Sequence, residues 1–188
     1  MLRRRTNRTV LARSARLELT EPGRGDAAVL AAAVGRSRTL HHPWVFPPAT
    51  EVAAELWVER VRGGDVEAHL AWSGGDLVAV VNVNNIVLGG LQSGSLGYYG
   101  FAGHTGQGFV AEAVGAVVRR SFNDLGLHRL EANIQPANLR SRRVAERLGF
   151  RLEGYSPRYL LIDGEWRDHE RWAITVEDVA DDVGQERQ

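Results

Sequence analysis

Cysteine is absent from the 188 residues of this chain. Its absence excludes disulfide bonds, thiolate metal sites and a cysteine acyl-enzyme mechanism. The chain also has no excess of charge of one sign, since Lys plus Arg and Asp plus Glu number 23 each and the formal net charge is zero. A neutral chain lacks the positive field of a dedicated nucleic-acid-binding protein.

Long apolar runs are missing as well. Runs such as Leu77–Val81 fall far short of the roughly 18 residues that a membrane span needs. The basic start of the chain, Arg3–Arg8, is followed by an apolar stretch that stops at Arg13, so we expect no signal peptide. These features favour a cytoplasmic protein without membrane contact. We expect residues 1–13 to form a flexible, solvated basic arm; a weak contact of this arm with RNA or an acidic partner is the alternative.

The length suits a single domain, and there are no internal repeats. Apolar spacing predicts helices over 26–34, 50–61, 109–125 and 138–148. Alternating patterns predict strands over 16–19, 67–72, 77–83, 95–101, 129–135, 158–162 and 165–175. Turn signals at Gly74-Gly75-Asp76 and Asp163-Gly164 indicate two hairpins.

This order of elements predicts an α/β (mixed α+β) domain. The sheet should be mixed and mostly antiparallel, with helices on both faces. We assign the domain to residues 14–177, followed by a flexible tail over 178–188. In the helix 50–61, Leu56, Val58 and Val61 are expected to be buried. The prolines of 41–48 predict an irregular loop that carries Trp44.

The segment Gly103–Ala113 carries the clearest chemical signal. A strand leads into a turn with Gly106 and Gly108, and a helix follows. Glycines let backbone N–H groups approach a ligand, and a helix N-terminus adds unpaired donors, so the turn indicates a phosphate site. A tight turn without a ligand is the alternative. Gly106-x-Gly108-x-x-Ala111 also fits the dinucleotide fingerprint, but no series of parallel strand–helix–strand units surrounds it.

The stretch Asn138–Phe150 contains Asn-x-x-Ser and ends in Gly-Phe. Together with Leu96-Gly97-Tyr98-Tyr99, the glycine turn and Asp163–His169, it resembles the GNAT superfamily of N-acetyltransferases. The order and spacing of these motifs are most similar to the ribosomal-protein alanine N-acetyltransferases of the RimJ/RimL type. The resemblance covers most of the chain and is strongest from Leu96 to Ile174.

The resemblance implies acetyl-CoA as the cofactor and no metal. The backbone of Tyr99–Phe101 would bind the pantetheine arm, the turn His104–Val110 would hold the pyrophosphate, and Asn138 would contact the arm. Ser141 would act as general acid toward the departing thiolate. The cofactor set is therefore Tyr99, Phe101, His104, Thr105, Gly106, Gln107, Gly108, Phe109, Val110, Asn138 and Ser141. By spacing alone, Asn138 is equally a helix N-cap and Ser141 an ordinary residue of the first turn.

Two departures from the family pattern concern the chemistry. Gly103 stands where the glycine turn usually carries Arg or Gln, so a phosphate contact is missing or is made by His104 or Gln107. Leu160 stands where some RimL-type enzymes have a carboxylate base. Glu112 is the nearest carboxylate and is our candidate catalytic base, although an acid in a first helical turn also stabilises the helix dipole. Removal of the proton through water is the alternative.

Because the only candidates for the base are Glu112 and water, we favour an acceptor amine that loses its proton easily. An α-amino group has a pKa of about 8, whereas that of lysine is about 10.4. We therefore expect acetyl transfer by direct attack of a protein N-terminal α-amine, possibly that of a ribosomal protein, which should enter beside Trp44 and Tyr98. The alternatives are a small-molecule amine (aminoglycoside, polyamine or amino acid) and a non-catalytic acyl-CoA-binding protein. A monomer and a homodimer are both compatible with the sequence.

Overall fold

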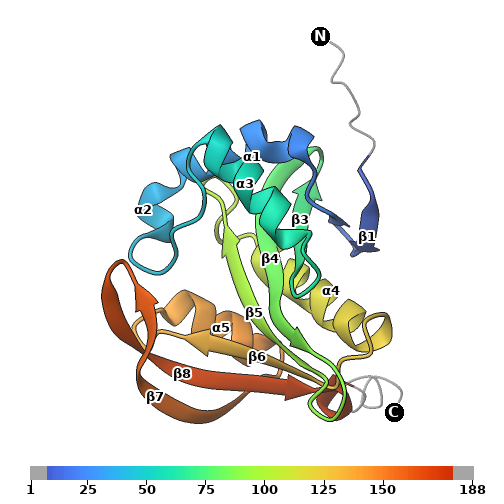
Figure 1. Cartoon of the computed structure of the whole chain (residues 1–188), viewed down its shortest axis with the longest axis vertical. Helices are drawn as coiled ribbons and strands as arrows, with labels where there is room; N and C mark the ends of the chain where they lie inside the picture. Colours follow the sequence, from blue (N-terminus) through green and yellow to red (C-terminus); the bar gives the residue numbers. More distant parts are fainter. Residues whose placement is uncertain (1–7, 180–188) are drawn as a thin grey trace.

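The computed structural model describes residues 8–179, so residues 1–7 of the expected arm and 180–188 of the expected tail lie outside the described residues. This part of the chain forms an eight-stranded sheet in the order β1-β2-β3-β4-β5-β6-β8-β7 (Figure 1). The strands are β1 Val10–Arg13, β2 Glu18–Thr20, β3 Glu67–Ser73, β4 Asp76–Val87, β5 Ser93–Gly100, β6 Arg129–Ile134, β7 Arg151–Ile162 and β8 Glu165–Thr175. The helices are η1 Arg24–Asp26, α1 Ala27–Arg36, α2 Arg38–His41, α3 Glu51–Val61, α4 Phe109–Asn123 and α5 Leu139–Arg147.

Helices cover both faces of the sheet, as predicted. Residues of β3 and β4 alternate between two cores: Leu70 and Val80 pack with α1 and α3, whereas Ala71 and Val81 pack with α4 and the end of α5. Every strand pair is antiparallel except β5–β6. The predicted fold class is therefore confirmed. No helix within the described part of the chain is long and apolar enough to cross a membrane.

The parallel strands β5 and β6 separate along their length. They pair from Ser93–Arg129 to Leu96–Ala132 and no further. Beyond that point β5 continues beside β4 and β6 continues beside β8. Because each strand then follows the twist of a different neighbour, the two move apart and leave unpaired backbone on their facing edges. β5 therefore leaves β6 four residues before it ends at Gly100.

One residue of α3 that we expected in the core, Leu56, is exposed. Leu56 is 67% exposed, whereas its neighbour Trp57 is only 8% exposed. The buried face of α3 consists of Ala54, Trp57, Val58 and Val61, at spacings of three and four residues. The large indole therefore occupies the core, and Leu56 lies on the solvent side.

Part of the expected arm is also structured. Val10–Arg13 form β1 and pair with β2, so the prediction of a flexible arm up to residue 13 was wrong for this segment. Arg8 lies with its guanidinium carbon 3.6 Å from the Trp72 ring centroid and donates from Nε to Asp26 Oδ1 at 2.8 Å. These contacts hold Arg8 because Asp26 is buried and needs a cationic partner.

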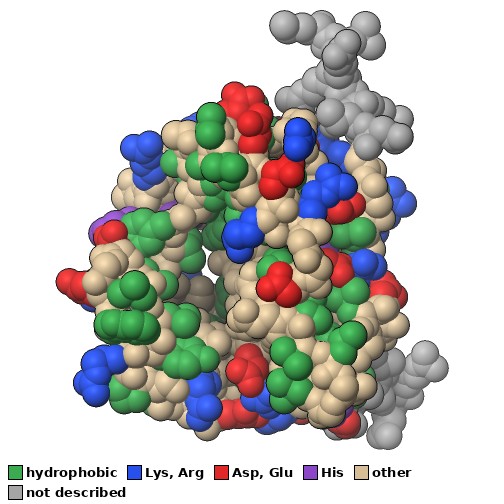
Figure 2. Space-filling view, in the orientation of Figure 1, with side chains coloured by type: hydrophobic (Ala, Val, Ile, Leu, Met, Phe, Trp, Pro, Cys, Tyr) green, Lys and Arg blue, Asp and Glu red, His purple; other side chains and the backbone are tan. Residues whose placement is uncertain are grey.

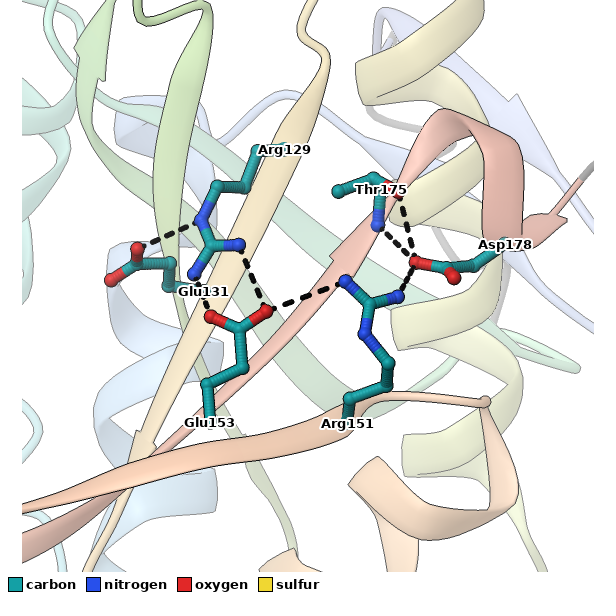
Figure 3. Close-up of polar contacts among 6 residues, drawn as sticks. All are labelled: Arg129, Glu131, Arg151, Glu153, Thr175 and Asp178. Carbon is teal, nitrogen blue, oxygen red and sulfur yellow. Dashed lines mark hydrogen bonds and ion pairs between the residues drawn. The ribbon is translucent and has the colours of Figure 1, made fainter.

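The edge strand β7 begins at Arg151, seven residues earlier than predicted. An ion-pair network joins its start to β6 and to the end of β8 (Figure 3). Glu153 accepts from Arg129 Nη2 at 2.5 Å and from Arg151 Nη2 at 3.3 Å. Arg129 Nε also donates to Glu131 at 2.9 Å, and Arg151 donates to Asp178. The network therefore joins the start of β7 to β6 and to the segment after β8.

Replacing Glu153 by Gln should lower the free energy of unfolding by about 1 kcal/mol, because the carboxylate lies between two guanidinium groups. The hydrogen bond from Arg129 holds the pKa of Glu153 below its ordinary value. The stabilisation by Glu153 is therefore fully present above the pKa that this carboxyl has in the unfolded chain. It is lost as the pH falls through the lower pKa of the folded state. Urea unfolding of both proteins at neutral and acidic pH measures the difference. Glu59→Gln, which breaks an exposed pair with Arg24, is the control and should leave stability unchanged.

Candidate functional site

A cleft of about 660 Å³ opens where β5 and β6 separate. Its walls come from α2 and the following loop, the turn before α4, one side of α5, and β8. In the orientation of Figure 1, the surface is hollowed between the α2 region and the β7–β8 hairpin (Figure 2). The following predicted site residues line the cleft: Trp44, Tyr98, Tyr99, His104, Thr105, Gly106, Gly108, Phe109, Val110, Asn138 and Ser141.

The glycine turn has the backbone conformation that its sequence predicts. Gly103, Gly106 and Gly108 have φ angles of +88°, +75° and +79°, a region that side chains with a Cβ rarely adopt. Gly108 is the N-cap of α4 and has no side chain to bind the first N–H groups of the helix. Those donors, with the positive end of the helix dipole, form a site for an anion at the cleft.

Three arginines of α5 add positive charge to the same cleft, and the sequence analysis missed them. Arg140, Arg143 and Arg147 all line it. Their spacing of three and four residues places the three side chains on one helix face, and this spacing could have predicted a basic face from the sequence. The Nη1 atom of Arg147 lies 3.9 Å from the position that a Cβ of Gly108 would take. The helix therefore brings a cation to the glycine turn, although Gly103 occupies the usual position for one.

Asn138, Ser141 and Tyr98 form a connected group at the start of α5. The Asn138 side chain accepts from Ser141 N at 3.2 Å and is thus the helix cap. Tyr98 donates from its hydroxyl to the Ser141 carbonyl at 3.1 Å, and burial raises the pKa of this phenol far above its ordinary value. The Ser141 hydroxyl makes no hydrogen bond to another described residue. It is therefore available to a ligand in the cleft.

The opposite wall is aromatic. Trp44 is half-buried beside His41, a residue that the sequence analysis did not select. The His41 ring packs edge-on against Tyr99 at 5.2 Å, and its Nε2 lies 2.8 Å from the Gly100 carbonyl. Burial lowers the pKa of His41, so the ring is neutral at physiological pH. Tyr98, the other residue that we expected beside the acceptor, also lines the cleft and packs with the α4 and α5 side of the sheet.

Three predicted residues do not line the cleft. Phe101 is buried against α1 and α3, and its carbonyl accepts from His104 N. Gln107 turns its side chain to the Gly103 carbonyl and accepts from Arg16 through its own carbonyl. Glu112 makes its hydrogen bonds outside the cleft. Leu160, the departure noted above, is on the hairpin opposite Arg167 and is also absent from the cleft wall.

The surroundings of Glu112 suit a structural carboxylate. It accepts from Ser14 Oγ at 2.7 Å, from Arg16 N at 2.9 Å and from Arg16 Nε at 2.7 Å. Partial burial by itself raises the pKa of Glu112, but these hydrogen bonds outweigh it, and the pKa lies below its ordinary value. The carboxylate thus ties the chain before β2 to the first turn of α4. The structure does not bring it to the cleft where we expected a base.

Comparison with known proteins agrees with this architecture. The family model for the acetyltransferase (GNAT) domain matches residues 16–151, and the chain therefore belongs to the GNAT family. The resemblance inferred from the sequence motifs is confirmed, and the dinucleotide alternative was wrong.

Two relatives share sequence with part of the chain. The probable N-acetyltransferase YjcK of Bacillus subtilis is 42% identical over 98 residues, which cover 52% of this chain and 54% of YjcK. The [ribosomal protein uS5]-alanine N-acetyltransferase of Escherichia coli is 41% identical over 103 residues, which cover 55% of this chain and 53% of that protein. The matches thus span about half the length of these relatives. The solved structure of Mycobacterium smegmatis RimJ in complex with CoA-disulfide is similar over 91% of this chain and 90% of its own, with 28% identity and a TM-score of 0.82.

Proposed function

We propose that this chain is an N-acetyltransferase that moves an acetyl group from acetyl-CoA to a primary amine. The observation that carries the proposal is the opening between β5 and β6, which leads directly to the glycine turn at the start of α4. RimJ of M. smegmatis, which has the same fold, binds a CoA derivative.

The cleft fits the cofactor chemically. Pantetheine carries amides, which can pair with the unpaired backbone of β5 beyond Leu96. The pyrophosphate would lie at the glycine turn, where α4 supplies N–H donors and Arg147 a guanidinium. Arg140 and Arg143 would keep the surrounding field positive. The lack of a basic residue at position 103 is thus compensated from α5.

Bound acetyl-CoA supplies the activated acetyl group as a thioester. The residues of the chain would place the amine beside it, and direct attack needs no covalent intermediate on the protein. Ser141 would give its hydroxyl proton to the sulfur, since this hydroxyl lines the cleft and is not engaged by another described residue. Tyr98 holds the Ser141 carbonyl and thereby fixes the start of α5.

The acceptor that we propose is a protein N-terminal α-amine. No Asp or Glu side chain of the described residues lines the cleft, whereas three arginines and three histidines do. A polyamine or an aminoglycoside carries several positive charges and needs carboxylates for recognition, which this wall does not offer. A peptide N-terminus carries one ammonium and can lose its proton near neutral pH. The name of the E. coli relative, an alanine N-acetyltransferase of a ribosomal protein, points to the same class.

The test is a competition between acceptor classes. A library of peptides with free N-termini, and a panel of spermidine, an aminoglycoside and free amino acids, are each incubated with the protein and acetyl-CoA. Mass spectrometry should find acetylated peptide N-termini and no acetylated polyamine. Product from small amines alone would overturn the peptide acceptor. CoA binding by calorimetry without product from either set would instead favour a non-catalytic acyl-CoA-binding protein.

A further inference from the structure

Among the described residues, no Asp or Glu lines the cleft, whereas three histidines could take up the amine proton. His41, His104 and His169 line the wall. His104 belongs to the glycine turn and packs edge-on against Phe109 at the cofactor end. His41 has Nε2 against the Gly100 carbonyl, while its Nδ1 is buried without a partner and thus covered from the cleft. Neither of these two is placed to receive a proton from an amine.

His169 differs from both. It lies on β8 next to Glu170, which forms the last pair with β6 at Ile134. The residue therefore stands where β6 ends and the cleft begins. Side chains alternate along a strand, and Trp172, three residues further, packs on the core beside α4 and α5. His169 is consequently on the other face of the sheet, the face from which α2 and Trp44 border the cleft.

The hydrogen bonding of the ring leaves one nitrogen available. His169 Nδ1 lies 3.0 Å from the Arg167 carbonyl, which can only accept, so Nδ1 carries the proton. Nε2 then has a lone pair and makes no hydrogen bond to another residue of the described chain. Tyr159 of β7 packs edge-on against the ring at 6.0 Å and fixes its plane. The imidazole is therefore held in one tautomer and one orientation, as a general base requires.

We propose that His169 Nε2 is the general base that takes a proton from the acceptor ammonium. The proposal rests on the acetyl transfer proposed above. The proton moves from the ammonium nitrogen to Nε2, and the freed lone pair forms the N–C bond to the thioester carbonyl carbon. The C–S bond breaks with its electron pair on sulfur, which takes the Ser141 hydroxyl proton. The amide nitrogen loses its second proton to restore Ser141, and His169 releases its proton to water.

The surroundings of His169 define the expected pH dependence. Burial lowers the pKa of His169, and Asp168 and the Arg167 carbonyl only partly oppose this. The neutral base therefore persists to a pH below the ordinary histidine value, and kcat should rise through that lowered pKa and then level off. On the cleft wall, His169 is accompanied by Gln135 after β6, His41 on α2, and Arg140 and Arg143 on α5. Outside the wall, its neighbours are Tyr159 on β7, which packs against the ring, and Asp168 on β8, which accepts from Arg158 N. Only Asp168 among them is acidic.

Replacing His169 by Gln should lower kcat about 100-fold near neutral pH, while KM for acetyl-CoA stays unchanged. The acid limb of the kcat profile should disappear, and activity should recover at alkaline pH, where the amine loses its proton unaided. His128→Gln is the matched control, because His128 is exposed, pairs with Glu177 and lies just before β6, at the end of that strand away from the cleft. Its profile should equal that of the unmodified protein. A normal kcat with an unshifted acid limb in His169→Gln would overturn the proposal.

Two further measurements keep the proposal testable if this variant does not fold or if peptides are not acceptors. Nitrogen-15 NMR of the protein without ligand should show His169 protonated on Nδ1 alone, with a pKa below the ordinary value. A ring protonated on Nε2 would contradict the proposal whatever the acceptor.

In the second measurement, the pH profile of kcat of the unmodified protein is recorded with a peptide and with a small amine of different pKa. If the acid limb lies at the same pH with both acceptors, it reports a group of the enzyme and supports His169. If the limb shifts with the pKa of the acceptor, it reports the amine and contradicts the proposal. Failure of the peptide alone would refute only the proposed acceptor.

Discussion

Replacing Gly108 by Val is expected to weaken CoA binding by at least about 100-fold. The residue has a φ of +79°, and a Cβ would point toward Arg16 and Arg147, with the nearest guanidinium nitrogens at 3.6 Å and 3.9 Å. A branched side chain there would stand between the phosphate and its donors. Loss of two charge-assisted hydrogen bonds, each about 1.5–3 kcal/mol, corresponds to a factor of that size or more. Calorimetric titration with CoA measures it.

Gly126→Val separates the loss of the phosphate site from backbone strain. Gly126 also has a positive φ, +66°, but it lies after α4 and has open space around its Cβ position. Both variants should lose stability, because a left-handed conformation costs roughly 1–2 kcal/mol in a residue with a side chain. Only Gly108→Val should lose CoA affinity. Equal affinity losses in the two variants would show that the glycine turn acts through folding alone.

Replacing Ser141 by Ala is expected to lower kcat by roughly 10²–10⁴-fold, the usual contribution of a positioned general acid. Ser141 donates from its backbone N–H to the Asn138 side chain, and its backbone carbonyl accepts from the Tyr98 hydroxyl. Neither hydrogen bond uses the Ser141 side chain. They survive the substitution, so the start of α5 should remain intact. KM for acetyl-CoA and the melting temperature should therefore change little.

Tyr98→Phe is the informative comparison for Ser141→Ala. It removes the phenol that holds the Ser141 carbonyl but leaves the Ser141 hydroxyl in place. We expect a smaller fall in kcat than in Ser141→Ala. The reverse order, with near-normal turnover in Ser141→Ala and a large loss in Tyr98→Phe, would assign the acid to Tyr98. Stopped assays of kcat and KM at several acetyl-CoA concentrations distinguish these outcomes.

Features that depend on neighbours along the chain were predictable from the sequence. Asp163-Gly164 predicted a tight hairpin, and both residues have positive φ. Gly106 and Gly108 predicted a turn that leads into a helix, and Asn138 predicted a helix cap. Such features follow from local sterics and hydrogen bonds, which a short stretch of sequence specifies by itself.

Features that depend on distant segments were not predictable in this way. Glu112 resembled a candidate base until the fold placed Ser14 and Arg16 around it. Trp57 and Leu56 are adjacent, and only the packing of α3 on the sheet decided which one is buried. In each case the deciding contact joins residues far apart in the sequence, and no local pattern carries that information.

The sequence alone therefore determined the fold class, the glycine turn and the family resemblance, because periodicity and turn chemistry are local properties. The tertiary structure alone decided where β5 and β6 separate and which residues face that opening. It placed the arginines of α5 at the turn before α4 and His169 at the end of β6. Charges and bases act over a few ångströms in space, so their roles follow from the packing of strands and helices and not from their order in the chain.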